Sequence, residues 1–326
     1  MKAVLLEAFG SPDVMYIGET DAPVPAAGQV LVQVRATSVN APDIVQRKGK
    51  YPPPEGDSNI LGVEMAGIIT STGPGVTGWR PGDRVMGLVG GGGYAEYAAA
   101  RADHLIPIPE SMSFEQAACV CETYITAFLN IFRIGNFRND RTILIHGGGG
   151  GVNTAAIQLC RVLTPESTII VTASTAKTDR VRQLGAHHVI DYRQQDFADE
   201  IRSITHKKGV DLILDHVGAA YLDRNMKSLA YGGKLVVIGV ISGIKAELNL
   251  AVMMVKRQQI IGSVLRSRSV QEKAAITADF TRTVLPKFAD GSISPVIWKV
   301  FPLDQVREAH RAMEEGRHFG KIVLKI

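Results

Sequence analysis

The sequence contains little cysteine: only Cys119, Cys121 and Cys160 occur among its 326 residues. An odd and small number of cysteines excludes a disulfide framework. The C-x-C spacing of the first two is not the paired C-x-x-C arrangement of a structural zinc site, and no second cluster completes one. We therefore expect no metal and a reducing, cytoplasmic location.

Long apolar runs and strong charge imbalance are also missing. No apolar stretch approaches the roughly 18–20 residues that span a bilayer, and the first residues lack the features of a secretory signal. Lys and Arg number 36 against 32 Asp and Glu, and they are dispersed, with small clusters at Lys207-Lys208 and at Arg266 with Arg268. Membrane and nucleic-acid partners are therefore not expected, although a mildly positive surface suits an anionic cofactor.

The first 120 residues or so are predicted to be rich in β-structure. Gln29–Val34 alternates apolar and polar residues, as a half-buried strand does. Turn signals such as Gly73-Pro74-Gly75 interrupt the strand-like pieces that follow. This pattern favours a small, partly closed β-structure over a parallel sheet.

The pattern of apolar residues changes near residue 113. Ser113, with Gln116 three positions later, predicts the start of a helix. Short, continuous apolar runs then alternate with helical windows, which is typical of a parallel sheet covered on both faces. The predicted strands are Thr142–Ile145, Thr168–Val171, Val189-Ile190, Leu212–Leu214 and Lys234–Ile238, and the helices include Thr154–Leu163, Asp179–Leu184 and Val270–Phe288. We expect the last segment, with a helix at Leu303–Met313 and a strand at Ile322–Ile326, to return to the first domain.

Five consecutive glycines, Gly147 to Gly151, stand between a predicted strand and a predicted helix. Such a loop lets the backbone approach a pyrophosphate, whose charge meets the helix N-terminus. The candidate binding residues are Gly148, Gly150, Gly151, Val152 and Asn153. Asn153 stands where the G-x-G-x-x-G pattern has its third glycine, and it could bond a phosphate, cap the helix or shift it.

The second predicted strand ends without the acidic residue that binds the ribose of NAD. Its end reads Val171-Thr-Ala-Ser-Thr175, and Lys177 and Arg180 follow closely. Cations and hydroxyls without a nearby carboxylate suit the 2′-phosphate of NADP. The alternative is that both cations are solvated charges on a helix surface.

Short motifs along nearly the whole chain resemble the quinone oxidoreductase (zeta-crystallin-like) branch of the zinc-free medium-chain dehydrogenase/reductase superfamily. The matching stretches are Ser38–Asp43, Gln46–Pro54, Leu61–Glu64 with Gly67, Gly82–Val85, Gly93–Tyr97, Thr126–Phe128, Gly151-Val152, Leu184–Ala186, Asp211 with Asp215 and Gly218, and Gly320–Val323. The stretch Leu265–Arg268 resembles most the inducible quinone oxidoreductases of that branch.

The resemblance implies an α/β protein with two domains: a GroES-like, β-rich catalytic domain (residues 1–120 and 262–326) and a Rossmann, doubly wound parallel-sheet domain for NADPH (residues 121–261). It also implies a homodimer. Carried over residue by residue, it assigns Lys177 and Tyr192 to the 2′-phosphate, with Ser174 beside it, and Thr126 to the nicotinamide end. It assigns the backbone near Val240, Ser263 and Leu265 to the carboxamide, and Asn40, Asp43 and Tyr51 to the substrate side. His318 occupies a place where relatives can carry a cofactor-contacting Asn.

Departures from the zinc-dependent members of the superfamily concern the metal ligands. Asn40 stands where those enzymes have a Cys, Val63 where they have a His, and the structural zinc lobe with four cysteines is missing. No ligand set for a carbonyl-polarising metal remains. We expect Cys119 and Cys121 to pack in the core and Glu64 to be structural.

The predicted reaction is hydride transfer from NADPH to a quinone or a related α,β-unsaturated carbonyl, with the protein supplying position and electrostatics. Asn40 would orient the substrate or the nicotinamide ribose, and Tyr51 or solvent would donate the proton. Alternatively, Asn40 and Asp43 stabilise the turn around Pro42, and Tyr51 packs in its proline-rich loop. Two other functions stay open: an enoyl-thioester or alkenal reductase, and a mainly non-catalytic NADPH-binding protein.

Two histidines near the glycine loop are expected to be structural. His146 precedes the loop and is predicted to bond the backbone there. His216 follows Asp215 at a strand end.

Overall fold

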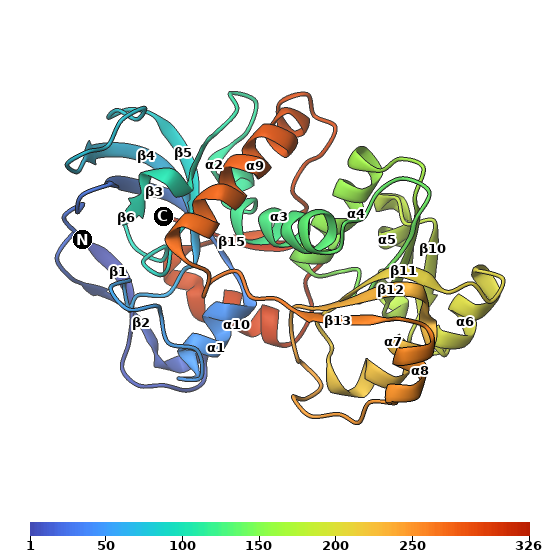
Figure 1. Ribbon diagram of the computed structural model, residues 1–326. Helices are drawn as coiled ribbons and strands as arrows, with labels where there is room; N and C mark the ends of the chain where they lie inside the picture. Colours follow the sequence, from blue (N-terminus) through green and yellow to red (C-terminus); the bar gives the residue numbers. More distant parts are fainter. The chain divides into compact units, whose positions relative to one another are not determined.

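The computed structural model describes residues 1–326, which divide into two compact units. The β-rich unit comprises Met1–Ile125 and Arg266–Ile326, and the parallel-sheet unit comprises Thr126–Leu265. The C-terminal segment thus belongs to the same unit as the N-terminus (Figure 1). No helix has the length and apolar character that a membrane crossing requires.

A seven-stranded sheet organises the β-rich unit. Its long central strand, β3, pairs on one side with β4 and on the other with β15, both antiparallel, and β6 also pairs with β3. The strands in spatial order are β14 (Ile297–Pro302), β15 (Lys321–Lys325), β3 (Gln29–Val39), β4 (Glu64–Thr72), β5 (Arg84–Leu88) and β7 (Leu105–Pro107), with β6 at Tyr97–Arg101. A separate antiparallel pair consists of β1 (Lys2–Leu6) and β2 (Met15–Glu19).

The predicted alternation in β3 is confirmed. Val30, Val32 and Val34 are buried, and they pack with Met65 and Ile69 of β4 in one core cluster. Period-two burial of this kind places the valines on the core and leaves Leu31 and Gln33, which are only partly buried, on the other face of the sheet.

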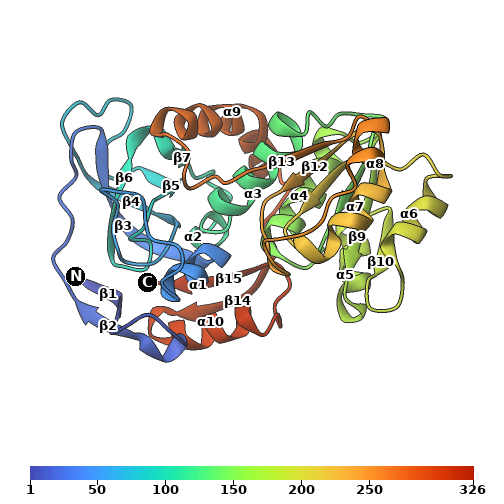
Figure 2. The same ribbon diagram turned by 60° about the horizontal axis from the view of Figure 1, so that its bottom comes forward.

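Five α-helices begin in the β-rich unit. They are α1 (Ala41–Arg47), α2 (Phe114–Ala117), α3 (Cys121–Phe128), α9 (Val270–Ala289) and α10 (Val306–Glu314). The predicted helix start at Ser113 is confirmed, because its hydroxyl accepts from the backbone N–H of Gln116, whose side chain accepts from the N–H of Ser113. α10 packs against β14 and β15 (Figure 2).

The parallel-sheet unit has six parallel strands in the order β10-β9-β8-β11-β12-β13. Their bounds are β8 (Thr142–Ile145), β9 (Thr168–Ala173), β10 (His188–Asp191), β11 (Val210–Asp215), β12 (Leu229–Val237) and β13 (Gln259–Gly262). The predicted doubly wound parallel sheet is therefore confirmed. The order reverses at β8, and in such sheets ligands bind at the carboxyl ends of the strands next to the reversal.

Helices cover both faces of this sheet: Figure 1 shows α4 on one side of the strands and α7 and α8 on the other. The helices are α4 (Gly151–Leu163), α5 (Thr178–Leu184), α6 (Phe197–Ile204), α7 (Leu222–Ser228) and α8 (Leu250–Val255). α5 ends as predicted at Gly185, whose φ of 112° is left-handed. α4 begins earlier than predicted, at the last glycine of the loop.

Short 3₁₀ turns and one π-helical turn complete the chain. They are Pro12–Val14, Ala102–His104, Thr175–Lys177, Ala219–Tyr221 and Leu303–Gln305, and the π-helical turn is Leu129–Ile134.

Candidate functional site

The glycine loop leaves the carboxyl end of β8 and enters α4 at the strand-order reversal. Gly147 has a φ of 75°, which side chains rarely tolerate. A Cβ on Gly148 would lie 2.6 Å from Val171 Cγ1 and 2.8 Å from Val181 Cγ2, so only glycine fits against β9 and α5. The loop is therefore packed into one defined conformation in which the first turn of the 13-residue helix α4 faces the strand ends.

Asn153 binds the glycine loop from within α4. Its side-chain N–H donates to the carbonyl oxygen of Gly147 at 2.6 Å. The helix N-cap is Gly150, so Asn153 is not the cap. A bond to the loop backbone was not among the roles that the sequence left open for Asn153. The buried Asn153 Oδ1 has no partner.

A buried chain of hydrogen bonds supports the loop from the sheet. Asn225 Nδ2 donates to Asp215 Oδ2 at 3.1 Å, which leaves Asn225 Oδ1 to accept from His146 Nε2 at 2.7 Å. His146 Nδ1 then accepts from the hydroxyl of Thr172 at 3.1 Å, and that hydroxyl accepts from the N–H of Gly147 at 3.1 Å. The histidine therefore acts on the loop through Thr172. The direct bond to the loop backbone that the sequence analysis predicted for His146 is not observed.

Burial keeps both histidines near the loop neutral at pH 7. It lowers the pKa of His146 to about 3, partly opposed by the bond to Asn225, and lowers the pKa of His216 to about 4. The ring of His216 lies against Gly147, where an added Cβ would be 2.7 Å from it. Both histidines shape the loop.

Cations gather at the carboxyl ends of β9 and β10. The side chain of Lys177 lies over the loop, since a Cβ on Gly149 would be 2.5 Å from Lys177 Cδ and 3.3 Å from its Nζ. Burial lowers the pKa of Lys177, and the neighbouring positive charges of Arg180 and Arg193 lower it further. A lysine with two arginines close enough to act on its charge marks a place where an anion is favourable.

Tyr192 and Ser174, assigned from the resemblance, belong to the same strand ends. Tyr192 follows β10 and is 41% exposed, and its N–H donates to the carbonyl of Ala173, at the end of β9. Ser174 follows Ala173 directly. The sequence analysis did not single out Arg193, whose place beside Lys177 depends on the pairing of β9 with β10.

Two carboxylates lie near this cluster in the sequence: Asp179, which pairs with Arg182, and Asp191, at the end of β10. Asp191 is hydrogen-bonded by groups after both strands: Thr175 Oγ1, in the turn after β9, donates to Asp191 Oδ2 at 2.6 Å, and the N–H of Arg193 donates to Oδ1 at 3.0 Å. β9 itself ends without an acid, as expected from the sequence.

Two of the residues assigned to the nicotinamide end have a buried hydroxyl without a partner. These hydroxyls are Thr126 Oγ1 and Ser263 Oγ. Buried polar groups in proteins are nearly always hydrogen-bonded, so these two hydroxyls leave hydrogen-bonding groups that a polar ligand would satisfy. Val240 is 49% exposed and Leu265 is buried, which gives this region an apolar component. The residues of the parallel-sheet unit thus fit a bound dinucleotide.

On the β-rich unit, Asn40 and Asp43 form the head of α1. Asp43 Oδ2 accepts from the backbone N–H of Asn40 at 2.8 Å and from the Tyr94 hydroxyl at 3.2 Å, and Oδ1 accepts from the N–H of Gly62 at 3.0 Å. Burial raises the pKa of Asp43 to about 6, against the lowering effect of these bonds. These contacts match the alternative interpretation of the sequence, in which Asn40 and Asp43 stabilise the turn around Pro42.

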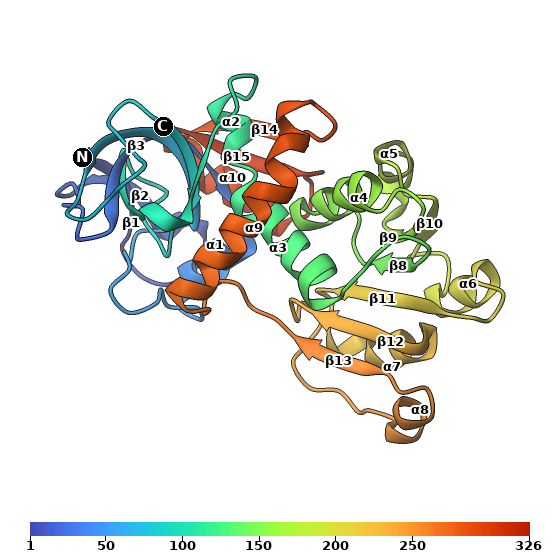
Figure 3. The same ribbon diagram turned by 45° about the horizontal axis from the view of Figure 1, so that its top comes forward.

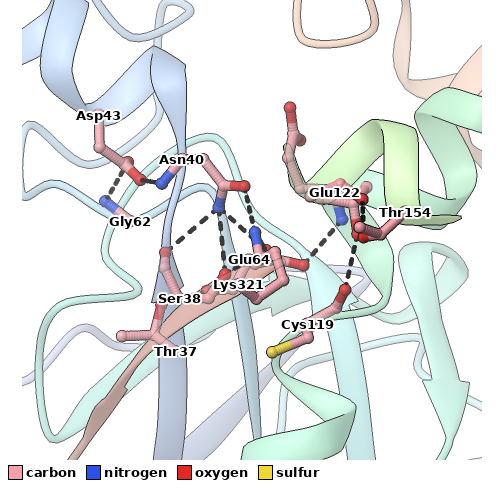
Figure 4. A network of polar contacts seen from close by, with 12 residues as sticks. Thr37, Ser38, Asn40, Asp43, Gly62, Glu64, Cys119, Glu122, Thr154 and Lys321 are labelled. Atoms are coloured by element: carbon pink, nitrogen blue, oxygen red, sulfur yellow. Dashed lines mark hydrogen bonds and ion pairs between the residues drawn. The ribbon is translucent and has the colours of Figure 1, made fainter. Parts of the chain in front are cut away.

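The amide of Asn40 enters a second buried network, shown in Figure 4. Its Nδ2 donates to Glu64 Oε1 at 2.9 Å and to Ser38 O at 3.2 Å, and its Oδ1 accepts from Lys321 Nζ at 2.5 Å. Lys321 Nζ also donates to Glu64 Oε1 at 3.0 Å. No local pattern could reveal this lysine, because 281 residues separate it from Asn40.

Tyr51 is half-buried beneath the guanidinium of Arg266, whose central carbon lies 5.0 Å from the ring centre. Arg266 also donates to Gln46 Oε1 at 2.7 Å and to the carbonyl of Gly90 at 2.5 Å. Burial raises the pKa of the Tyr51 phenol, and the positive charge of Arg266 opposes that rise. The ring is thus held in place while part of the side chain stays accessible.

No three His, Cys, Asp or Glu side chains come close enough together to hold a metal ion. Cys119 and Cys121 are buried and unpaired, and burial raises the pKa of both thiols. His318 lies half-buried between α10 and β15.

Two family descriptions match the chain. The alcohol dehydrogenase GroES-like domain matches residues 26–110, and the zinc-binding dehydrogenase family matches residues 184–324. The GroES-like fold expected for the β-rich unit is thereby confirmed.

Curated relatives match over nearly the whole chain. The mouse quinone oxidoreductase is 33% identical over 330 residues, which cover 99% of this chain and 97% of that protein. The rat synaptic vesicle membrane protein VAT-1 homolog is 31% identical over 340 residues, covering 99% and 84%.

Solved structures agree with this fold. An NAD-dependent alcohol dehydrogenase superposes with a TM-score of 0.88 at 30% identity and covers 100% of both chains. The CurK enoyl reductase superposes with a TM-score of 0.88 at 27% identity and covers 99% of this chain and 98% of its own.

Proposed function

Because this chain belongs to the quinone oxidoreductase-like branch of the medium-chain dehydrogenase/reductase superfamily, whose members are oxidoreductases that use a nicotinamide cofactor, we propose that it is an NADPH-dependent quinone reductase. The reaction is hydride transfer from NADPH to quinones or related α,β-unsaturated carbonyl compounds, without a metal. The observation that carries the choice of NADPH is the cluster of Lys177, Arg180 and Arg193 beside the end of β9, which has no acid.

Each part of the parallel-sheet unit has a role in holding this cofactor. The first turn of α4 and the glycine loop bind the pyrophosphate through backbone N–H groups. Lys177 and Tyr192 bind the 2′-phosphate, with Ser174 beside it. Thr126 and Ser263 offer their unpaired hydroxyls to the nicotinamide end, where Val240 and Leu265 pack. The bound cofactor supplies the hydride, and the protein supplies position.

On the substrate side, we propose Tyr51 as the proton donor. Its ring is fixed by Arg266, and part of it is accessible. Asn40 and Asp43 shape the wall of the site from the head of α1, because their polar atoms are engaged within the β-rich unit. Replacing Tyr51 by Phe should therefore lower kcat/KM by roughly tenfold or more, with the KM for NADPH unchanged.

The test of this function is the oxidation of NADPH, followed by its absorbance, with benzoquinone, phenanthrenequinone and crotonyl-CoA as acceptors, in parallel with NADH. Turnover of quinones with a strong preference for NADPH supports the proposal. Equal rates with NADH would overturn the role of the cationic cluster, and turnover of the thioester alone would overturn the choice of acceptor.

Structural similarity to the CurK enoyl reductase favours one alternative function, reduction of an enoyl thioester or alkenal. A mainly non-catalytic NADPH-binding role is the other alternative. It predicts tight NADPH binding without turnover of any of the three acceptors.

We also propose that the chain forms a homodimer through the edge of the parallel sheet. β13 is the last strand of the sheet (Figure 3), and the parallel-sheet unit exposes many large apolar side chains before and along it. These are Ile241, Ile244, Leu250, Met254, Val255, Ile260 and Val264. An apolar free edge is a template for pairing with a second copy. A cytoplasmic location, which suits the three unpaired cysteines, completes the proposal.

A further inference from the structure

The match to a zinc-binding dehydrogenase family implies a metal, yet the residues of the GroES-like domain at the place of the metal ligands do not fit one. Asn40 and Val63 replace the two ligands expected there. Instead, the ammonium group of Lys321 lies 2.5 Å from Asn40 Oδ1 and 3.0 Å from Glu64 Oε1. The Lys321 side chain is 4% exposed and the Glu64 side chain 1%.

We propose that the Lys321 ammonium is the resident cation of this site and excludes a metal ion from it. The buried carboxylate of Glu64 requires a cation beside it. Glu64 Oε1 accepts from Ser38 Oγ at 2.5 Å and from Asn40 Nδ2, while Oε2 accepts from the backbone N–H of Glu122 at 2.8 Å. These are neutral donors, and a buried carboxylate also needs an opposite charge. Lys321 supplies it.

The same ammonium fixes the orientation of the Asn40 amide. A lysine ammonium only donates and a carboxylate only accepts, so Asn40 must turn its oxygen to Lys321 and its nitrogen to Glu64. A rotation of the amide by half a turn would oppose donor to donor and acceptor to acceptor. Figure 4 shows Lys321, Asn40 and Glu64 meeting at this point.

The sheet register brings the lysine there. β15 pairs antiparallel with β3, with Ile322 opposite Val39 and Val323 opposite Ser38. The next residues beyond this register are Lys321 and Asn40. The cation is thus built into the central strands of the β-rich unit and is not held by a mobile loop.

Removal of the ammonium leaves oxygen atoms that suit a hard cation. Asn40 Oδ1, Glu64 Oε1 and Ser38 Oγ already converge within hydrogen-bond distance of one another or of Nζ. Oxygen ligands of this kind favour Mg²⁺ or Mn²⁺ over zinc. With Lys321 present, a divalent ion would stand beside a positive charge and would lack these oxygens.

The test compares the metal content of the wild-type protein, Glu64→Gln, Lys321→Ala and the double variant Lys321→Ala/Glu64→Gln, measured by equilibrium dialysis against Mn²⁺ and by elemental analysis. Lys325→Ala, on the exposed end of the same strand, is the matched control. We expect about one bound Mn²⁺ in Lys321→Ala only. Stoichiometric Mn²⁺ or Zn²⁺ in the wild-type protein that is lost in Glu64→Gln would overturn the proposal, and so would no binding to folded Lys321→Ala.

Thermal unfolding provides a second measurement that does not depend on a metal. Lys321→Met keeps the length of the side chain but removes its charge, so it should melt well below the wild-type protein. Lys321→Met/Glu64→Gln, which removes both charges, should recover part of the loss. If the double variant melts lower than Lys321→Met, the lysine serves packing alone and the proposal fails. The expected melting temperatures do not depend on which acceptor the enzyme reduces, so this test is independent of the proposed function.

Discussion

The amide of Asn153 donates to the carbonyl oxygen of Gly147 at 2.6 Å, and this bond ties the start of α4 back to the beginning of the glycine loop. Asn153→Ala should release the loop without changing the sheet. Since one hydrogen bond contributes about 1 kcal/mol, we expect about fivefold weaker NADPH binding, measured by calorimetric titration.

Arg161→Ala, near the other end of α4, is the control for this substitution, and its NADPH affinity should equal that of the wild-type protein. Asn153→Gly restores the third glycine of the pattern but removes the bond, so it should behave like Asn153→Ala. An affinity of Asn153→Gly at or above the wild-type value would show that the bond does not support the loop.

Lys177 lies over Gly149 beside two arginines, and this position predicts its effect on cofactor choice. Lys177→Ala should raise the KM for NADPH about tenfold, which corresponds to about 1.4 kcal/mol for one charge-assisted contact to a phosphate. The KM for NADH should stay the same, because NADH has no 2′-phosphate. The matched control is Arg182→Ala on α5, whose guanidinium pairs with Asp179. Equal effects on both cofactors would exclude a specific phosphate contact.

Ile260 is 38% exposed on β13, the free edge of the parallel sheet. A lysine there is one of the devices by which proteins prevent edge-to-edge pairing. Ile260→Lys should therefore convert a dimer to a monomer in light-scattering chromatography. Val24→Lys changes an even more exposed apolar residue, on the β-rich unit, and should leave the dimer intact. A wild-type protein that elutes as a monomer would contradict the proposed interface directly.

The parallel sheet could be predicted because most of its strands are short apolar runs between helical windows, such as Thr142–Ile145. β13 escaped prediction because it lies at an edge: Gln259 and Ile260 are exposed, so the strand has no run of buried residues. Edge strands of this kind have neither the alternating nor the continuous apolar pattern.

The site was predictable where its residues are neighbours in the sequence. The glycine loop lies between β8 and α4, and Lys177 lies between β9 and α5, so each belongs to a local strand-loop-helix unit that the sequence pattern predicted. The pairing of Lys321 with Asn40 and Glu64 depends on the register of β15 against β3, which no short motif encodes. Likewise, Asn153 could be identified as an exception to the glycine pattern, but its partner required the three-dimensional loop.

The neutral His146 makes stability depend on pH in a defined direction. Burial lowers its pKa in the folded protein to about 3, against 6.5 for the ordinary side chain. Between these values the unfolded chain binds a proton that the folded protein does not, so the free energy of unfolding falls as the pH drops below about 6.5. His146→Gln keeps a donor for Asn225 but removes this titration. We expect its melting temperature to fall less steeply than that of the wild-type protein between pH 6.5 and 4.

The carboxyl of Asp215 is linked to His146 by two hydrogen bonds through Asn225. Its protonation changes the free energy of unfolding in the opposite direction, so it affects the comparison of the wild-type protein with His146→Gln. Burial raises its pKa to about 6, so in the folded protein it takes up a proton before the unfolded chain does, and this favours the folded state between about pH 6 and its ordinary value of 3.8. The difference between wild type and His146→Gln cancels this contribution as long as Asn225 still donates to Asp215. His188→Gln, which changes an exposed histidine, is the control and should follow the wild-type curve. Parallel curves for His146→Gln and wild type would mean that His146 takes up its proton in the folded protein as readily as in the unfolded chain. The bond between His146 Nδ1 and the Thr172 hydroxyl would then have to run from the histidine to the threonine.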